Sequence, residues 1–498
     1  MYRPADHSQI AKSGQVAVCP ALYAPVFPVN SRTNESRTPR GHRADSRQSI
    51  YDCKQQKRIC APRFKRDAAL FAKENALLAP LHAFIVRIMK FRTGFVLVFI
   101  TFITAVNGRA ADTSSLEGKV VCGYQGWFRA EGDGSGLGWV HFGAGKRLAP
   151  GSCTFDLWPD TSGFDDSERF PTPFVFEDGS TAELFSSIHP KTVHRHFQWM
   201  REYGIDGAFV QRFGTVIASQ RERPSADQVL SHCIEAAMAE DRTLTVMYDL
   251  TNFPASEFST IARDWRQILA NGWGQNRCSQ KYAGRLLVAV YGLGFAKQPA
   301  AIEPWRTLIA ELRASGSSIM LGIPTYWREA KGDALSDNAF HELLREADIL
   351  SPWTVGRMAR ITDVDRIAAN VWKKDLEWCN NEGKGYIPVI FPGFSWHNLS
   401  KNRGEDAKLD AIPRQGGRFL WKQALEAKRA GAKTLYVAMF DEIDEATAVM
   451  KCSHRRPVGE SPFVDLSDAP SDHYLWLCGQ AGRMIRREIA ESDVLPLR

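Results

Sequence analysis

The sequence predicts an α/β fold, a single (β/α)8 TIM barrel formed by residues 112–498. Short apolar segments recur eight times in that region, and segments with helical periodicity separate them. Eight alternations of strand and helix are typical of this barrel. The strand segments are apolar on both faces, as expected for parallel strands that helices cover. An open doubly wound sheet is the alternative, but no G-x-G-x-x-G motif follows any of the strands.

The elements are expected at regular intervals along residues 112–498. The strands are predicted at Lys119–Trp127, Ile205–Phe213, Leu244–Thr251, Leu286–Leu293, Ser318–Trp327, Asp348–Val355, Tyr386–Trp396 and from Thr434 onward. Apolar residues recur at a spacing of three to four between the strands, which indicates helices. These helices are predicted at Val193–Tyr203, Ala226–Ala239, Phe258–Leu269, Pro304–Leu312, Phe340–Ala347, Ile367–Trp378, Phe419–Ala430 and about His473–Ile489.

Two connections are long and lack periodicity. The first runs from Phe128 to Pro190 and is rich in Gly, Asp, Trp and Phe. The second, Met450–Asp472, follows the last strand. Long loops in compact domains are usually functional or disordered, and so many aromatic residues argue against disorder. We therefore expect the first connection to form a lid over the top of the barrel.

The N-terminal part of the chain resembles a leader followed by an export signal. Residues 1–88 are rich in Arg, Ser, Pro and Gln, which predicts disorder. Residues 89–111 combine a basic start at Met89, an apolar run from Gly94 to Val106 and small residues around Ala110, the pattern of a signal peptide. Because such a peptide belongs at the N-terminus, we expect translation to begin at Met89 and residues 1–88 to be a mis-called extension. An internal membrane anchor is the alternative, although the run is short for a span.

Either interpretation places residues 112–498 outside the cytoplasm, secreted or periplasmic after cleavage near Ala110. The charge distribution agrees with a leader that is separate from the body. Residues 1–110 contain 18 Lys and Arg against 6 Asp and Glu, a net charge of +12, whereas the remainder has 45 against 50 and is −5. Outside residues 1–110 the chain therefore has no excess of basic residues that would bind nucleic acid, and nucleic acid is not an expected partner. The sequence gives no oligomeric state.

The ten cysteines are scattered along the chain, seven of them between Cys122 and Cys478. No C-x-x-C or H-E-x-x-H motif occurs, so we expect no structural zinc site, no other metal and no cofactor. Export would allow one or two disulfides, but spacing does not determine the pairing.

Polar and aromatic residues gather at the predicted C-terminal ends of the strands. In a (β/α)8 barrel these ends share one mouth, where active sites lie. The predicted binding set is Tyr124, Gln125, Trp127, Gln211, Arg212, Tyr248, Asp249, Tyr291, Tyr326, Trp327, Arg328, Trp353, Arg357, Trp396 and His397, with Asn252 and Asn398 nearby. Aromatic faces stack on sugar rings and polar groups bind hydroxyls, whereas no Gly-rich cradle for phosphate occurs. The set therefore predicts a carbohydrate ligand.

The last strand leads into four acidic residues within five positions: Asp441, Glu442, Asp444 and Glu445. A solvated loop or a calcium-binding loop are the simpler interpretations of such a cluster. Residues three apart on an extended strand point to opposite faces, so Glu442 and Glu445 converge only if the chain turns sharply after Asp441. Glycoside hydrolysis commonly uses two carboxyl groups, one protonated and one ionised. Mutual repulsion of two close glutamates would raise one pKa and keep an acid protonated.

The acidic segment resembles the W-N-E-W-H-E-G-T stretch of the endo-α-mannosidase glycoside hydrolases. It reads F-D-E-I-D-E-A-T from Phe440 to Thr447, so both glutamates and the threonine align. Further matching segments are GYQGWF at 123–128, GIPTYWR at 322–328, SPWTVGR at 351–357 and FPGFSWHN at 391–398. These segments are similar to a secreted bacterial subgroup related to both the endo-α-mannosidases and the α-1,3-glucanases, glycoside hydrolase families 99 and 71. The resemblance covers about residues 115–452 and implies a (β/α)8 barrel.

The resemblance also implies roles for the two glutamates. Glu442 would act as a base that draws the proton from the sugar 2-hydroxyl, so that an epoxide-like intermediate forms. Glu445 would act as the acid/base at the leaving oxygen. The chain differs from the motif by having Phe, Asp, Ile, Asp and Ala at positions 440, 441, 443, 444 and 446. The additional acids Asp441 and Asp444 are expected beside the substrate, where they could raise both pKa values or bind a cation.

Three hypotheses for function follow. The first is a secreted glycoside hydrolase that degrades a poly- or oligosaccharide. The second is a non-catalytic glycan-binding barrel, which would leave the two glutamates pointing apart or buried in ion pairs. The third is a cation-dependent polysaccharide lyase, whose activity would not survive chelation.

Overall fold

The computed structural model describes residues 112–297 and 302–498. The predicted leader, residues 1–88, and the predicted signal peptide, residues 89–111, lie outside the described residues. Both therefore stay predictions.

The described residues form a barrel of parallel strands. Around the sheet they are β10 (Gly385–Tyr386), β9 (Ile349–Trp353), β8 (Ser318–Pro324), β7 (Arg285–Tyr291), β5 (Thr243–Asp249), β4 (Gly207–Phe213), β1 (Val120–Tyr124), β12 (Leu435–Val437) and β11 (Val389–Ile390). Every pair of neighbours in this order is parallel. Each of the eight predicted strands is present.

The segment Gly385–Ile390 closes the barrel, because its two ends pair with different neighbours. Its first half, β10, pairs with β9, and its second half, β11, pairs with β12. The residues between the halves continue this exchange: Ile387 N donates to Leu350 O at 3.0 Å, and Pro388 O accepts from Tyr436 N at 3.1 Å. The sheet is therefore a closed (β/α)8 barrel of eight strands, and the doubly wound alternative is wrong.

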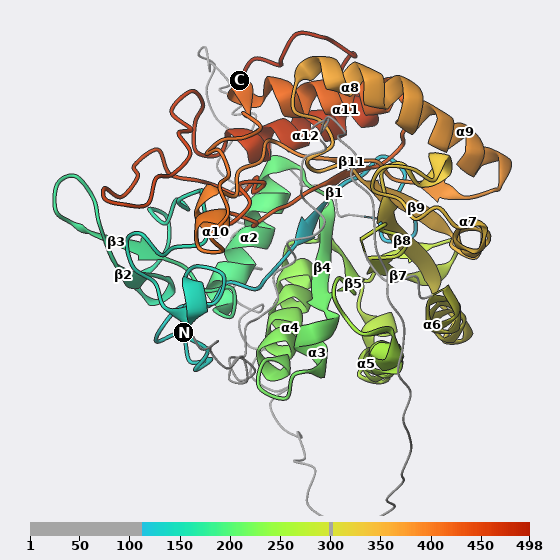
Figure 1. The fold of residues 1–498 in the computed structure, drawn as a ribbon, viewed down its shortest axis with the longest axis horizontal. Helices are drawn as coiled ribbons and strands as arrows, with labels where there is room; N and C mark the ends of the chain where they lie inside the picture. Colours follow the sequence, from blue (N-terminus) through green and yellow to red (C-terminus); the bar gives the residue numbers. More distant parts are fainter. Residues whose placement is uncertain (1–111, 298–301) are drawn as a thin grey trace, which may run out of the picture. The chain divides into compact units, whose positions relative to one another are not determined.

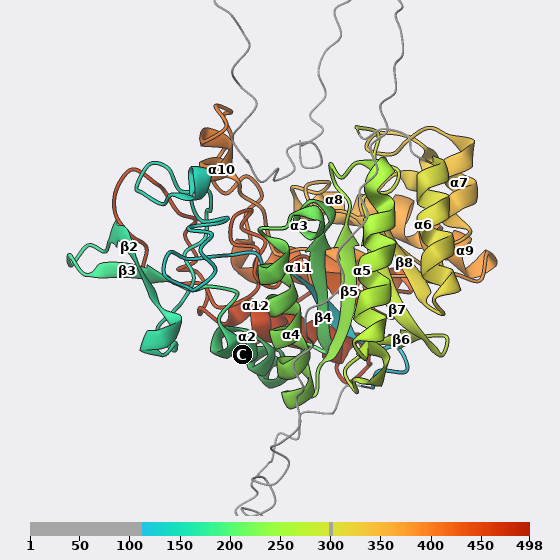
Figure 2. The ribbon, with the colours of Figure 1, turned by 90° about the horizontal axis from the view of Figure 1, so that it is seen from below.

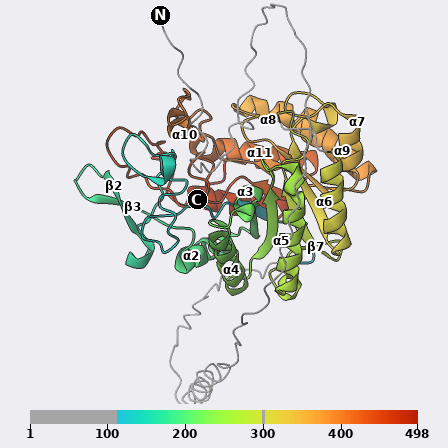
Figure 3. The ribbon, with the colours of Figure 1, turned by 60° about the horizontal axis from the view of Figure 1, so that its bottom comes forward.

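Helices connect successive strands and cover the sheet (Figures 1–3). They are α2 (Pro190–Tyr203), α4 (Arg223–Ala239), α5 (Phe258–Ala270), α6 (Ile302–Ala314), α7 (Asn338–Leu344), α8 (Ile361–Ile367), α9 (Lys373–Asn381), α11 (Arg418–Ala430) and α12 (His473–Ile485). A π-helical segment at Ala368–Trp372 joins α8 to α9. The predicted helix at 367–378 is therefore part of a longer helical stretch from Ile361 to Asn381. The last helix ends four residues earlier than predicted.

The strands are buried on both faces, in agreement with their continuous apolar runs. Every residue of β1, β8 and β9 is buried. Full burial of one aliphatic side chain contributes about 1.5–3 kcal/mol, so these strands supply much of the hydrophobic stabilisation. The covered sheet is therefore a rigid support for the loops at its C-terminal end.

Several short elements were not predicted from the sequence. The long first connection contains an antiparallel hairpin of β2 (Phe170–Val175) and β3 (Thr181–Leu184). One-turn helices α3 (Gly214–Ala218) and α10 (His397–Lys401) follow β4 and β11, and β6 (Lys281–Tyr282) precedes β7. Segments this short carry too few periods of a hydrophobic pattern to be recognised.

The first connection is fastened to the barrel through Asp156. The Asp156 carboxylate accepts hydrogen bonds from Ser395 Oγ at 2.6 Å, His397 N at 2.6 Å and Asn398 N at 2.9 Å. It thereby joins the connection after β1 to the loop after β11. These contacts fasten the connection to the barrel, and its role as a lid over the top of the barrel stays a prediction.

The described cysteines, from Cys122 to Cys478, are all free and buried. Among residues 112–297 and 302–498, no helix has both the length and the apolar character needed to cross a membrane.

Candidate active site

The chain bends sharply after β12, in a segment that we call the acid turn (Phe440–Thr447). Phe440 N still donates to Gly123 O of β1, at 2.7 Å. Beyond it, Thr447 N and Ala448 N both donate to Glu442 O, at 3.1 and 3.0 Å. Ala446 has a positive φ of 52°, which lets the chain reverse. The four carboxyl groups of the acid turn are consequently held in a compact loop, and all four are buried.

Asp441 binds backbone amides at the end of β1. Its two carboxylate oxygens accept hydrogen bonds from Gln125 N at 2.7 Å and Gly126 N at 2.8 Å. Burial raises the pKa of Asp441 to about 7, although these two donors oppose the shift. Asp441 is not among the cavity-lining residues, so its observed contacts fasten the acid turn to the first strand instead of facing a ligand.

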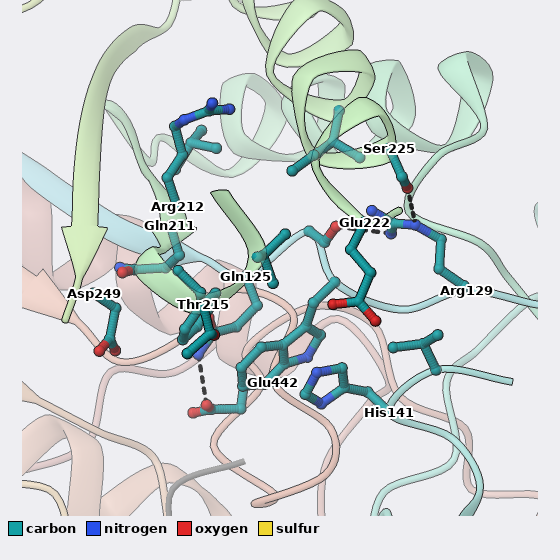
Figure 4. A pocket seen from close by; sticks show the side chains of 18 of the residues that line it. Gln125, Arg129, His141, Gln211, Arg212, Thr215, Glu222, Ser225, Asp249 and Glu442 are labelled. Carbon is teal, nitrogen blue, oxygen red and sulfur yellow. Dashed lines mark hydrogen bonds between the residues drawn. The ribbon is translucent and has the colours of Figure 1, made fainter. Parts of the chain in front are cut away.

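Glu442 has a hydrogen-bond donor on each carboxylate oxygen. Gln125 Nε2 donates to Oε1 and Thr447 Oγ1 donates to Oε2, both at 2.6 Å (the Gln125 bond is dashed in Figure 4). Burial raises the pKa of Glu442 to about 8, and the nearby Asp444 carboxyl adds to the shift. Glu442 lines the cavity in a fixed orientation.

Glu445 lines the same cavity as Glu442. Its backbone carbonyl accepts a hydrogen bond from Ser395 N at 2.9 Å, which anchors the end of the acid turn to the loop after β11. Its Oε2 is buried and has no hydrogen-bond partner among the described residues. Burial, followed by the proximity of Glu442 and Asp444, raises the pKa of Glu445 well above its usual range.

Asp444 pairs with a histidine from the first connection. His141 Nδ1 lies 3.2 Å from Asp444 Oδ2, and both side chains are buried. Burial lowers the pKa of His141 to about 3 and raises the pKa of Asp444 to about 8, so the contact joins two uncharged groups at neutral pH. His141 lines the cavity, whereas Asp444 lies behind it.

The cavity lies over one part of the barrel mouth (Figure 4). Its wall comes from the ends of β1, β4, β5 and β7, from the acid turn, and from α3, α4 and the first connection. The lining residues are Gln125, Gly126, Trp127, Arg129, Leu137, Val140, His141, Val210, Gln211, Arg212, Phe213, Thr215, Val216, Glu222, Ser225, Ala226, Val229, Asp249, Thr251, Tyr291, Glu442 and Glu445. None of the described residues between 302 and 434 contributes to this wall.

One wall of the cavity is a stack of three rings. The Trp127 ring stacks on His141, with centroids 3.8 Å apart and an interplanar angle of 7°. Phe213 stacks on Trp127 with a centroid distance of 5.0 Å. Trp127 therefore stacks on two neighbouring rings, which limits the access of a ligand to its faces.

The structure brings part of the predicted binding set to this cavity. The predicted residues in the lining are Gln125, Trp127, Gln211, Arg212, Asp249, Tyr291, Glu442 and Glu445. Burial raises the pKa of Asp249 to about 6, and Thr251 N donates to its Oδ1 at 2.8 Å. The guanidinium of Arg212 is directed away from Glu442 (Figure 4) and pairs with Asp264 at 2.8 Å. Its charge therefore serves a buried ion pair.

Other predicted residues bind structural partners outside the cavity wall. Tyr124 OH contacts His196 Nδ1 at 2.9 Å, and Tyr248 OH donates to Asp264 Oδ2 at 2.7 Å. Both tyrosines are fully buried, which corrects the expectation that their faces are open to a ligand.

The predicted residues after β8 and β9 also lie away from the cavity wall. Trp327 Nε1 and Arg328 Nε both donate to Asp375, each at 3.0 Å. Arg357 Nε donates to Asp333 Oδ2 at 2.7 Å, while the Tyr326 ring lies 6.0 Å from Lys331 Nζ. These contacts tie the loop after β8 to α9 and to the loop after β9.

The remaining predicted residues belong to the core and to the loop after β11. The Trp353 ring packs edge-on against Tyr291 at 5.2 Å, and Trp396 packs against Phe394 at 5.5 Å. His397 Nδ1 contacts Ala407 O at 2.6 Å. None of the three lines the cavity described above.

Sequence reasoning missed a polar group on the opposite wall. Arg129 Nε donates to Ser225 Oγ at 2.5 Å (dashed in Figure 4), and its Nη1 donates to Gly126 O and Phe128 O, both at 2.9 Å. Glu222 is close by and pairs with Lys146 at 2.9 Å. These residues lie on the first connection and at the start of α4, where no strand end indicated a site.

The described residues contain no group of three or more His, Cys, Asp or Glu side chains arranged to hold a metal ion. In the acid turn, Asp441, Glu442 and Asp444 bind amide, hydroxyl and imidazole partners instead.

Two solved structures of the GH99 endo-α-mannosidase from Bacteroides thetaiotaomicron match the barrel. One, in complex with bis-tris-propane, has a TM-score of 0.54 and 15% identity, and covers 75% of this chain and 99% of its own. The other also has a TM-score of 0.54, with 14% identity, and covers 76% of this chain and 100% of its own. The chain has the fold of these endo-α-mannosidases. No protein-family model matches the sequence, and a comparison with curated proteins gives no match.

The resemblance that the sequence motifs indicated is thus confirmed at the level of the fold. Identities of 14–15% do not carry over a substrate or a reaction. Function has to be argued from the residues of the acid turn and the cavity.

Proposed function

We propose that this protein is a glycoside hydrolase that cleaves O-glycosidic bonds of a poly- or oligosaccharide with Glu442 and Glu445 at the mouth of the barrel. The observation that carries the proposal is the shared cavity: both glutamates line it, and neither forms an ion pair with a described residue. The fold shared with endo-α-mannosidases supports the same conclusion.

The roles of the two glutamates follow from their environments. Glu445 has a raised pKa and a buried oxygen without a protein partner, and both favour its protonated form, which suits a group that donates a proton to the leaving oxygen. Glu442 has a pKa of about 8, so a minor part of it is ionised at neutral pH, and its two donors favour this charged form, which acts as the base.

In the proposed reaction the proton of Glu445 moves to the leaving oxygen as the bond from that oxygen to the anomeric carbon breaks. Glu442 takes the proton of the sugar 2-hydroxyl, and that oxygen bonds to the anomeric carbon. Water then adds to the same carbon and gives its proton to Glu445, while the bond from the 2-oxygen to that carbon breaks and the 2-oxygen recovers its proton from Glu442. Atoms and charge balance, and both carboxyl groups return to their starting states.

The cavity suits a sugar because polar groups and ring edges share its wall. Gln211 and Asp249 present amide and carboxylate groups, and Phe213 and His141 form the outer rings of the stack. Asp249 has a pKa of about 6 and is therefore charged at neutral pH, when it can accept hydrogen bonds from hydroxyls. We further propose that the enzyme is exported, on the basis of the signal-like segment at residues 89–111.

The test is a screen of the purified protein against α-mannans, α-glucans and plant or algal polysaccharides. Wild-type protein should release reducing sugar from one of them, and Glu445→Gln should release none while binding the same glycan. Binding without release by the wild type would support the glycan-binding alternative. Loss of activity on chelation, with an unsaturated product, would support the lyase alternative.

A further inference from the structure

His141 occupies an unusual position for a residue that only fills space. It has a φ of 62°, a left-handed conformation that costs a residue with a side chain about 1–3 kcal/mol. It is nevertheless fixed on three sides: by stacking on Trp127 at 3.8 Å, by Asp444 at 3.2 Å, and by Thr154 Oγ1, which donates to its carbonyl at 2.9 Å. The first connection therefore delivers one imidazole to the acid turn at an energetic cost.

The two ring nitrogens of His141 have different surroundings. Nδ1 contacts Asp444, whereas Nε2 has no hydrogen-bond partner among the described residues. Nε2 keeps contact with solvent, because it does not belong to the buried polar atoms without a partner. His141 also lines the cavity. Nε2 is thus the imidazole atom that a ligand can reach.

The proton on Nε2 depends on Asp444. If Asp444 is protonated, its hydroxyl donates to Nδ1, so the neutral imidazole must carry its proton on Nε2. If Asp444 is ionised, Nδ1 donates to it and Nε2 becomes an acceptor. No Lys or Arg forms an ion pair with Asp444 among the described residues, although the charge of Arg403 acts on it, and Glu442 and Glu445 lie beside it. A carboxyl group in this setting favours its protonated form.

We propose that His141 is a substrate-binding residue that donates a hydrogen bond from Nε2 to an oxygen of the sugar, and that Asp444 is the positioning residue that holds it in this tautomer. The inference rests on the proposed function, because it names a contact of the same site. Asp444 would fix the tautomer of His141 through Nδ1, as a carboxylate does for a histidine that binds a metal through its other ring nitrogen. The charged or titratable groups that influence the pair are Asp441, Glu442, Glu445, Asp156, Arg403, Arg129, Glu222 and Lys146.

The tautomer can be measured without any substrate. Full-length protein labelled with ¹⁵N-histidine is examined by NMR between pH 5 and 7, and the His141 resonances are assigned by comparison with His141→Gln and His141→Asn. We expect a neutral ring with its proton on Nε2 throughout this range. A ring protonated on Nδ1, or an imidazolium at pH 6, would overturn the proposal whatever the enzyme acts on.

The contact is tested by substitution of both residues. Asp444→Leu leaves Nδ1 without a donor and should raise KM at least tenfold, and Asp444→Asn should recover most of this loss because its amide N–H can donate to Nδ1. His141→Asn keeps a group near Asp444 but lacks the Nε2 donor, so it should weaken glycan binding at least tenfold in calorimetry on the Glu445→Gln protein. Equal losses in Asp444→Asn and Asp444→Leu, or wild-type binding by the His141→Asn protein, would refute the proposal. If no glycan is cleaved by wild type, the proposed function fails while the tautomer result stands.

Discussion

Gln125 Nε2 donates a hydrogen bond of 2.6 Å to Glu442 Oε1, joining the end of the first strand to the acid turn after the last strand. The same residue donates its backbone N–H to Asp441 at 2.7 Å. β1 and β12 are neighbours in the barrel, so their pairing determines the register between Gln125 and the acid turn. The position of the proposed base thus depends on the closed barrel and not on the loop alone.

Loss of either glutamate should reduce turnover strongly. Glu442→Gln and Glu445→Gln each keep the shape of the side chain but remove proton transfer, which typically contributes 10²–10⁴-fold to rate. We expect kcat on the identified glycan to fall by about 10³-fold, with circular dichroism unchanged. Glu303→Gln, an exposed position on α6, is the control and should keep full activity. Normal rates in either cavity variant would contradict the assignment.

Thr447→Val should change the pH dependence. The Thr447 hydroxyl donates to Glu442 Oε2 at 2.6 Å and favours the charged carboxylate, so its removal should raise the pKa of Glu442 above its value of about 8. The acidic limb of the kcat/KM profile should shift toward higher pH. The rate at pH 7 should fall about tenfold, as expected if the pKa of Glu442 rises by about one unit. Thr447→Ser retains the hydroxyl and should keep the wild-type profile. If the acidic limb of the profile does not shift in Thr447→Val, the hydrogen bond from Thr447 does not determine the pKa of Glu442.

Stability should fall as the pH rises. The pKa values of Asp441, Glu442 and Asp444 are raised to about 7, 8 and 8 in the folded protein, while the unfolded values are about 4. Between these values the folded state binds more protons, so the free energy of unfolding is highest below pH 4 with respect to these groups and decreases up to about pH 8.

This dependence can be measured as Tm at pH 5, 7 and 9. Glu442→Gln cannot ionise at that position, so its Tm relative to wild type should increase with pH. The effect is at most a few kcal/mol, because one pKa unit corresponds to about 1.4 kcal/mol and the groups are coupled. A constant difference in Tm across this range would contradict the raised pKa.

Asp264→Ala should destabilise the protein strongly. Asp264 accepts hydrogen bonds from Arg212 at 2.8 and 2.9 Å, from Arg223 at 2.9 Å and from Tyr248 at 2.7 Å, and it is buried. Removing one partner of a buried ion pair costs about 3–5 kcal/mol. Glu311→Ala removes a surface pair with Arg266 and should cost about 1 kcal/mol or less. Urea unfolding compares the two, and equal losses would contradict the structural role of Arg212.

The strands and the acid turn could be predicted from sequence because burial on both faces produces continuous apolar runs, and because acids after such a run are conspicuous. The direction of side chains at the strand ends was harder to predict. The polar groups of Arg212 and Tyr248 bind Asp264 on α5, although part of Arg212 lines the cavity beside Gln211, and Asp249 lines the cavity as well. Side chains alternate along a strand, so adjacent residues at a strand end direct their polar groups to different partners.

The first connection was the least predictable part of the site. It supplies His141 and Arg129 through a segment without periodicity, and its course depends on distant contacts such as Asp156 with the loop after β11. Only packing of the complete barrel reveals which residues such a segment delivers.

The cavity takes no lining residue from described positions 302–434, although the loops after β8, β9 and β11 border the same end of the barrel. The loops after β8 and β9 are therefore separable from the proposed chemistry, whereas the loop after β11 anchors Glu445 through Ser395 N. The loops after β8 and β9 can diverge in sequence or accept insertions without altering the proposed reacting groups. Protein engineers could graft recognition for longer polymers there while Glu442 and Glu445 remain in place.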